Sequence, residues 1–176
     1  YKDNTLNIKA EVNATITGQA THTLDVNGTK TQARSEILGA QTTIKDVNGS
    51  IEIETTVTND NNISFKVIAQ GNGEATHIVT LPNGKKSQAV SKIKGAQTII
   101  NTNNSIETIA SKNNKQAKVV TKEDGTNILE FNDGNNTINP LDNNSSFEAD
   151  SNATIEDVNG SLQITVESPL STPLQF

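Results

Sequence analysis

The stretch from Gly18 to Glu54 reads GQATHTLDVNGTKTQARSEILGAQTTIKDVNGSIEIE, and it returns from Gly73 to Glu107 as GEATHIVTLPNGKKSQAVSKIKGAQTIINTNNSIE. Its last part returns from Ala153 to Ile164 as ATIEDVNGSLQI. Matching residues in the first two copies are 55 or 56 positions apart, so that Ser50-Ile51-Glu52 matches Ser105-Ile106-Glu107. A fixed spacing of this kind is typical of tandem supersecondary units. The sequence therefore predicts three tandem units of about 55 residues.

Apolar and polar side chains alternate through these copies, as they do from Ala20 to Val26 and from Ile63 to Ala69. Strict alternation indicates strands with one buried face, and no segment keeps the apolar period of a helix. Asn-Gly pairs at 27–28, 48–49, 83–84 and 159–160 predict two-residue type I′ hairpin turns. The prediction is an all-β fold of antiparallel hairpins in an elongated repeat array. A threefold β-trefoil or β-prism is the alternative.

The chain divides at two polar joints, Thr58–Asn62 and Ser111–Lys115. We expect a first hairpin repeat over residues 1–58, a second over 59–110, and a degenerate third with a C-terminal tail over 111–176. The middle of the third repeat contains Pro140 and lacks the Gly-Ala-Gln-Thr element. Proline interrupts a central ladder, so this segment is predicted to be an edge strand, a capping loop or a binding loop. Two prolines also mark Ser168–Phe176 as a tail or linker.

Composition narrows the class of protein. The 176 residues include no cysteine, which excludes disulfides and thiolate metal sites, and only 3% are aromatic, which predicts a thin aliphatic core. The formal net charge of −6 opposes nucleic acid or an anionic membrane as a partner. No run of apolar residues is long enough for a membrane-spanning helix. Because the sequence starts at Tyr1 without an initiator Met, we expect a processed product or an excerpt of a longer protein.

Two histidines and three Asp-Val-Asn-Gly turns are the residues that could bind a metal. His22 and His77 match each other and lie on the apolar side of their strands, which favours a structural role over a metal site bridging repeats. The turns beginning at Asp25, Asp46 and Asp157 are too short for an EF-hand loop, and turn chemistry accounts for them. Weak calcium binding near Asp60 stays open. We predict no metal site and no cofactor.

No motif of an enzyme is present. Ser, His and Asp occur, but neither a nucleophile elbow nor a glycine-rich phosphate loop does. Glu52 and Glu54 share one face of a strand and are interpreted as solvated surface that guards an edge. The Thr-x-Thr triplets at 15–17, 21–23 and 29–31 are separated by turns, which disfavours an ice-binding ladder. The sequence predicts no catalytic and no cofactor-binding residues.

The pattern of ATHIVTLPNGK (residues 75–85), SKIKGAQT (91–98) and NNSIE (103–107) resembles the tandem β-repeats of large bacterial secreted adhesins and other cell-surface proteins. The resemblance covers about residues 6–110 closely and 116–168 loosely. It implies an extracellular or cell-surface location and a role as a spacer or filament-forming module, in which repeats set length and stiffness. It assigns no functional residue.

These observations favour a non-enzymatic structural or adhesive module. Its expected partners are other copies of itself or neighbouring repeats of a longer chain. Residues 6–12 and 162–167 are the strands that we expect to join copies through backbone pairing. A carbohydrate-binding, lectin-like module is the alternative, although one Tyr and four Phe offer few aromatic platforms for a sugar.

Overall fold

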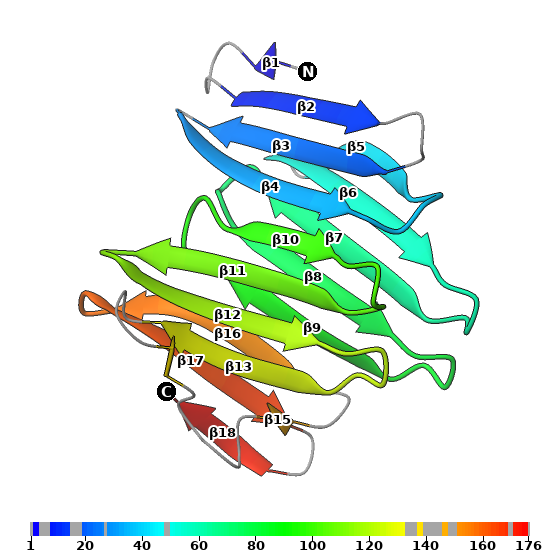
Figure 1. The fold of residues 1–176 in the computed structure, drawn as a ribbon. Helices are drawn as coiled ribbons and strands as arrows, with labels where there is room; N and C mark the ends of the chain where they lie inside the picture. Colours follow the sequence, from blue (N-terminus) through cyan, green and yellow to red (C-terminus); the bar gives the residue numbers. More distant parts are fainter. Residues whose placement is uncertain are drawn as a thin grey trace.

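The computed structural model describes residues 2–3, 8–14, 19–26, 28–47, 50–132, 137–138, 146–147, 151–168 and 171–175. Every regular element in this part of the chain is a β-strand, and the strands form two open sheets (Figure 1). The prediction of an all-β fold is confirmed. The first sheet runs in the order β1 (Lys2–Asp3), β2 (Ile8–Ala14), β3 (Ala20–Val26), β4 (Thr29–Ser35), β10 (Gln97–Ile100), β11 (Ile106–Lys112), β12 (Lys115–Thr121), β13 (Asn127–Asn132) and β14 (Thr137–Ile138), with β15 (Ser146–Phe147) also paired to β13.

The second sheet runs in the order β18 (Ser171–Gln175), β17 (Ser161–Ser168), β16 (Asn152–Val158), β9 (Lys86–Ser91), β8 (Ala75–Thr80), β7 (Ser64–Gln70), β6 (Ser50–Thr58) and β5 (Gln41–Val47). The chain therefore builds four antiparallel meanders that alternate between the sheets. Meander 1 (β1–β4) and meander 3 (β10–β14) lie in the first sheet, and meander 2 (β5–β9) and meander 4 (β16–β18) lie in the second. Each predicted repeat thus contributes strands to both sheets, and the number of repeats stays a prediction.

Two short segments of the same pattern carry the chain from one sheet to the other. Residues 36–40 follow β4 and residues 92–96 follow β9, and both end in Gly-Ala. Gly39 and Gly95 have φ of 81° and 84°, a backbone conformation that glycine adopts without the steric cost of a Cβ atom. The repeated Gly-Ala-Gln-Thr element therefore marks the switch between sheets.

The hairpin turns are of two kinds. Asn159 and Gly160 both have positive φ, as the predicted type I′ turn requires, and so do Asn113 and Asn114. Asn83-Gly84 is different, because only Gly84 has positive φ and Leu81 bonds both Gly84 N and Lys85 O. The type I′ prediction was wrong for this pair. This pair lies in a longer turn that ends in a bulge at Gly84. Pro82 is the second residue of that turn, a position whose φ matches the fixed φ of proline.

The longer turn recurs at five places in the second and third meanders. In each, the first residue donates to the carbonyl of the residue four positions on and accepts from the residue three positions on. The residue with positive φ is glycine or asparagine, and the five are Asn62, Gly73, Gly84, Asn104 and Gly125. The joints predicted at Thr58–Asn62 and Ser111–Lys115 are thus tight turns inside continuous sheets.

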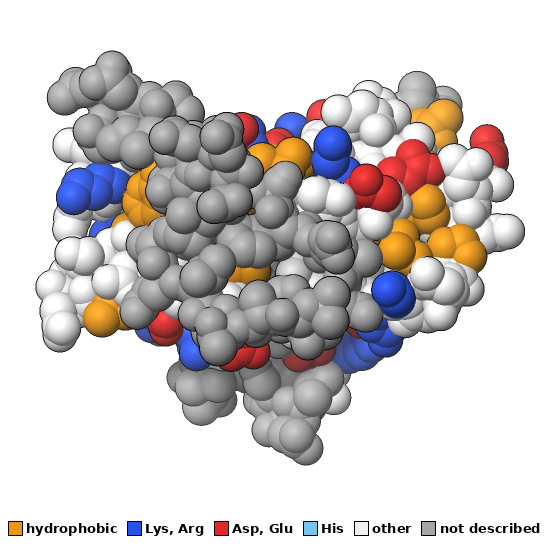
Figure 2. All heavy atoms as spheres, turned by 90° about the horizontal axis from the view of Figure 1, so that it is seen from below, with side chains coloured by type: hydrophobic (Ala, Val, Ile, Leu, Met, Phe, Trp, Pro, Cys, Tyr) orange, Lys and Arg blue, Asp and Glu red, His pale blue; other side chains and the backbone are white. Residues whose placement is uncertain are grey.

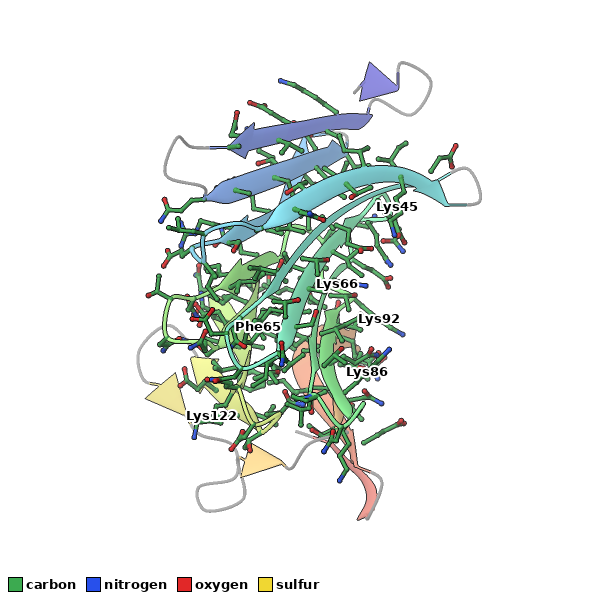
Figure 3. The ribbon with its side chains drawn as sticks, turned by 90° about the vertical axis from the view of Figure 1, so that its right-hand side faces the viewer. Lys45, Phe65, Lys66, Lys86, Lys92 and Lys122 are labelled. Atoms are coloured by element: carbon green, nitrogen blue, oxygen red, sulfur yellow. The ribbon has the colours of Figure 1, made fainter. Side chains whose placement is uncertain are left out.

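The core lies between the two sheets in three successive clusters. Leu24, Ile53 and Ala69 belong to the first cluster, Phe65, Val67 and Ile100 to the second, and Val119, Leu129 and Ile155 to the third. Each cluster combines residues of both sheets. Figure 3 shows the two layers from the side, with Phe65 between them and Lys45, Lys66, Lys86 and Lys92 along the second sheet. The sandwich has only two layers, so small aliphatic side chains are enough to fill the core between them, as the composition predicted.

Four expectations need correction or lie outside the described residues. Ser171–Gln175 is strand β18 rather than a tail, and its proline is tolerated because β18 is an edge strand. Residues 162–167 lie in β17 between β16 and β18, so they are not a free edge. The sheets are open and stacked, unlike a threefold trefoil or prism. The segment around Pro140 falls mostly outside the described residues.

Candidate stacking surface

In each sheet, one parallel strand pair joins the two meanders. The first strand of meander 3, β10, pairs with β4, and the first strand of meander 4, β16, pairs with β9. The register corresponds at both joints, because Thr98 lies opposite Ala33 and Ala153 lies opposite Ala89. Backbone bonds around the ladder also recur: Glu36 N donates to Ile100 O at 2.8 Å, and Lys92 N donates to Ile155 O at 2.8 Å. One geometry thus serves two joints.

A cross-sheet hydrogen bond accompanies each joint. Thr31 in β4 donates to the carbonyl of Gly73 at 3.3 Å, and Ser87 in β9 donates to the carbonyl of Gly125 at 2.6 Å. Thr31 and Ser87 are buried, and both glycines lie in turns of the opposite sheet. The strand that ends one meander is therefore held both sideways, by its parallel neighbour, and across the core.

The two histidines form buried ties between the sheets. His22 Nδ1 lies 2.8 Å from Thr55 Oγ1, and His77 Nδ1 lies 2.7 Å from Thr108 Oγ1. Both imidazoles are fully buried, and burial lowers the pKa of His22 to about 4 and that of His77 to about 3. The rings are therefore neutral at pH 7. Among the described side chains no group of three His, Cys, Asp or Glu could hold a metal ion.

His77 belongs to a longer chain of polar groups that His22 lacks. Its Nε2 lies 2.6 Å from Thr121 Oγ1, Thr121 bonds Asn127, and Asn127 donates to Ser151 Oγ at 2.7 Å. All of these side chains are buried. By contrast, buried His22 Nε2 has no hydrogen-bond partner among the described residues. The repeat alignment makes His22 and His77 equivalent, whereas their surroundings differ.

The third position of this series is apolar. Strand pairing makes Leu129 equivalent to His77, because Val67 lies opposite His77 and Val119 lies opposite Leu129. In the same way Val166 stands where Thr108 stands, and Ala153 where Thr98 stands, because Thr98 pairs with Thr108 and Ala153 with Val166. Leu129, Ala153 and Val166 pack in one cluster. Equivalent positions of the sandwich are thus filled by a polar set, His77, Thr98 and Thr108, in one place and by an apolar set, Leu129, Ala153 and Val166, in the next.

One end of the sandwich is open. Among the described strands, β5 is the last strand of the second sheet, and β1 covers β2 only at Ile8 and Lys9. The described large apolar side chains that are exposed, Val12, Leu38 and Ile44, lie in β2, in the segment between β4 and β5, and in β5. No further described strand therefore covers the core at this end.

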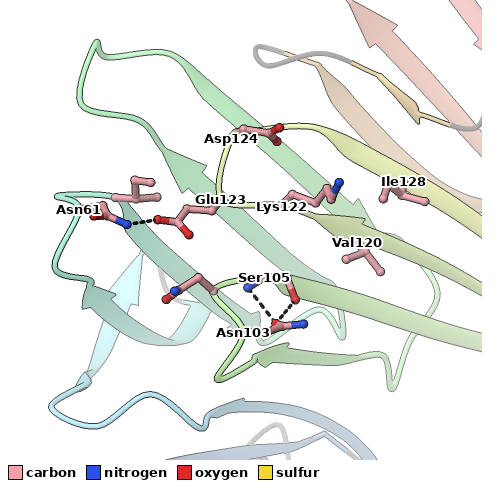
Figure 4. Close-up of a pocket in the computed structure, with 10 residues that line it drawn as sticks. Asn61, Asn103, Ser105, Val120, Lys122, Glu123, Asp124 and Ile128 are labelled. Carbon is pink, nitrogen blue, oxygen red and sulfur yellow. Dashed lines mark hydrogen bonds between the residues drawn. The ribbon is translucent and has the colours of Figure 1, made fainter.

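A separate hollow of about 690 Å³ lies where turns of the two sheets meet (Figure 4). Ile63, Val120 and Ile128 are its apolar residues, and Asn103, Glu123 and Asp124 are among its polar ones. Glu123 accepts hydrogen bonds from Asn61 Nδ2 at 2.5 Å and from Asn59 Nδ2 at 3.3 Å, which ties a turn of the first sheet to one of the second. Hydrogen bonds to Thr126 are the main cause that lowers the pKa of Asp124.

The acidic residues singled out in the sequence serve turns and surfaces. Asp25 accepts a hydrogen bond from Gly28 N at 2.8 Å, Asp157 pairs with Lys112, and Asp60 is exposed in the turn after β6. Glu52 accepts from Gln70 Nε2 at 3.3 Å. Glu54 lies between Lys45 and Lys66 at 2.8 and 3.4 Å; burial raises its pKa, but the two ammonium groups outweigh burial and lower it.

Charges of both signs are interspersed on the face shown in Figure 2. On the first sheet Lys118 pairs with Glu107 at 3.3 Å and with Glu130 at 3.5 Å. Lys118 and Glu107 occupy the positions of Lys66 and Glu54, so one ion pair recurs on the outer faces of both sheets. Within the described part of the chain no helix could span a membrane.

Comparison with known proteins gives no relative: no protein-family model matches the sequence, and neither does any curated protein at a significant level.

Proposed function

We propose that this chain is a non-enzymatic structural module, in which meanders stack into an elongated body that acts as a spacer or adhesive segment of an extracellular bacterial surface protein or filament. The observation that carries the proposal is the recurrence of the parallel joint at β4·β10 and β9·β16, with corresponding register and backbone bonds. Because the same joint occurs twice, a further meander can be added to a sheet through the same strand pairing. Repeat proteins grow by contacts of this kind between neighbouring units.

The side chains of the joints support a mechanical role. Thr31 and Ser87 tie each joint to the opposite sheet, and His22 and His77 tie the sheets to each other inside the core. The stack is thereby held in two directions, along the ladder and across it. Backbone hydrogen bonds and small aliphatic side chains provide this geometry, and no catalytic group is needed for it.

Insertion of one meander tests the proposal. A second copy of residues 41–96 placed directly after residue 96 supplies another β5–β9 and another sheet switch. We expect a folded, monodisperse protein in which the added β5 pairs with β4. Five strands shared between two sheets, at about 4.8 Å a strand, lengthen the particle by about 12 Å. Small-angle X-ray scattering measures this increase in the maximum dimension.

The matched control carries the same inserted residues in shuffled order, which keeps the mass and removes the strand pattern. It should gain no protected amide hydrogens. If the ordered insertion also left its added amides exchanging freely, stacking by meanders would be disproved. The proposed location is tested by immunolabelling of intact cells of the source organism, and labelling only after lysis would contradict it.

A carbohydrate-binding module is the second candidate, and the hollow of about 690 Å³ favours it. Its rim offers the amides of Asn61 and Asn103 and the carboxylates of Glu123 and Asp124, which are groups that bond sugar hydroxyls. Its apolar residues are aliphatic, whereas sugar rings stack best on aromatic ones. A glycan array should show hits that Glu123→Gln and Asn103→Ala remove, and an array without hits would eliminate this candidate.

A further inference from the structure

We infer that the open end of the sandwich binds another repeat of the same kind, whose last strand pairs in parallel with β5 (Gln41–Val47). The inference rests on the proposed stacking function and names its partner: a strand with the pattern Ser/Thr-Gln-Ala-x-Ser. It differs from assembly through residues 6–12 and 162–167, because it fixes the edge, the strand direction and the register.

The first observation is that β5 is equivalent to β10 and β16. Each of the three is the first strand of a meander. They are aligned by the cross-strand pairs Gln41 with Thr56, Gln97 with Ile109, and Asn152 with Glu167. β10 and β16 each have a parallel neighbour on their outer side, β4 and β9. β5 pairs with β6 as β10 pairs with β11 and β16 with β17, but no described strand lies on its other side.

The second observation is burial. Ile44 in β5 is 42% exposed, whereas its equivalents Ile100 and Ile155 are 0% exposed. Val12 in β2 is 38% exposed, whereas its equivalents Val67 and Val119 are 0% exposed. Both side chains face inward, because Ile44 pairs with buried Ile53 and Val12 pairs with buried His22. Two core positions are thus uncovered at this end.

The neighbours present at the other joints define the partner. β4 contains Thr31-Gln32-Ala33-Arg34-Ser35, and β9 contains Ser87-Gln88-Ala89-Val90-Ser91. The alanine fits opposite Thr98 or Ala153, and the first hydroxyl reaches a glycine carbonyl across the core. The carbonyl of Ile44 holds the position of those of Ile100 and Ile155, which accept from Glu36 and Lys92. A strand with the same pattern would therefore pair with β5 through the same ladder.

Disulfide trapping in a chain that has no cysteine of its own tests the inference. The protein carries Thr42→Cys, because Thr42 is equivalent to Thr98 and Ala153, and a synthetic peptide of residues 85–92 carries Ala89→Cys. Neighbouring parallel strands hold Cα atoms at a distance that a disulfide accepts. We expect this pair to cross-link at least about tenfold faster than peptides with cysteine at Gln88 or Val90, whose side chains point to the opposite face.

Two further variants keep the outcome clear. Thr43→Cys points away from the core and should trap the Ala89→Cys peptide no faster than the control peptides. Ile44→Lys, combined with Thr42→Cys, puts a charge on the edge and should abolish selective trapping. Circular dichroism verifies that each variant folds. Equal rates for all peptides, or faster trapping of a peptide of reversed sequence, would overturn the inference. Failure here with a successful meander insertion would refute only docking at β5, whereas failure of both would refute stacking itself.

Discussion

Ala69 occupies in β7 the position that Thr121 occupies in β12, since Ala69 pairs with Ala75 as Thr121 pairs with Asn127. This difference gives His77 Nε2 a hydroxyl at 2.6 Å, whereas buried His22 Nε2 has no partner in the part of the chain that the structure describes. A buried polar atom that loses its partner costs about 1–3 kcal/mol. The two halves of the sandwich are therefore unequal in polar satisfaction although their strands correspond.

Replacement of this hydroxyl is the first prediction. Thr121→Val keeps the shape of the side chain but removes the partner of His77, and we expect the free energy of unfolding to fall by about 1–3 kcal/mol. Ala69→Thr should be more stable than Ala69→Val by about 1 kcal/mol, because both add the same volume and only threonine can bond His22. Urea denaturation at pH 7 measures the free energy of unfolding of the three variants and of the unsubstituted protein. Equal stability of the Ala69→Thr and Ala69→Val variants would show that position 69 does not face His22.

Stability should fall as the pH is lowered from 7 to 5. The folded-state pKa values of about 4 for His22 and about 3 for His77 lie below the value of 6.5 in the unfolded chain. Protons therefore bind preferentially to the unfolded state, and the stabilisation that is complete above pH 6.5 is lost on the way down. Linkage gives about 2 kcal/mol for each histidine at pH 5. Urea midpoints at the two pH values measure the loss, and His22→Leu should remove about half of it. A midpoint that does not change with pH would contradict the burial of neutral imidazoles.

The equivalent polar and apolar fillings make a third prediction. His22→Leu alone removes one of the two hydrogen bonds of buried Thr55, whose Oγ1 also lies 2.9 Å from Thr42 Oγ1, and should cost about 0.5–1.5 kcal/mol. Adding Thr55→Val and Thr42→Ala reproduces the set of Leu129, Val166 and Ala153, and should recover most of that loss because no buried hydroxyl is left unpaired. Additivity of the three substitutions in thermal unfolding would argue against a shared site, since residues in contact are expected to couple.

The longer turns make a fourth prediction, because their fourth residue must adopt positive φ. Gly84 has φ of 88° and Asn104 has φ of 60°. Gly84→Ala should cost about 1–2 kcal/mol, whereas Gly84→Asn should cost less, since asparagine adopts this conformation at the equivalent turn. No heavy atom beyond its chain neighbours would meet a Cβ at Gly84, so strain of the backbone is the only term tested. Matching thermal midpoints for the alanine and asparagine variants would contradict it.

Sequence spacing aligned one hairpin on the wrong residues. The match of Ser50-Ile51-Glu52 with Ser105-Ile106-Glu107 is clear in the letters, but Glu107 is equivalent to Glu54 in the structure, because Glu54 lies opposite Thr43 and Glu107 opposite Ile99. Val47 pairs with Ser50 in the hairpin of β5 and β6, whereas the hairpin of β10 and β11 turns over residues 101–105. A change in turn length moves the register of a strand, and only strand pairing reveals it.

The strands, their buried faces and most of their turns follow from the sequence alone. Alternation placed His22 and His77 on the inner face, and the Asn159-Gly160 pair placed a two-residue turn, because side-chain period and positive φ are properties of a few neighbouring residues. Which sheet each hairpin joins depends instead on contacts between residues far apart in the chain. The parallel pairing of β4 with β10 joins residues more than sixty positions apart, and it depends on the sheet switch at Gly39 and Gly95 and on the core between the layers. Local pattern records which face of a strand is buried, but it does not record what covers that face, and so it could not show that Ile44 is left open where Ile100 is covered.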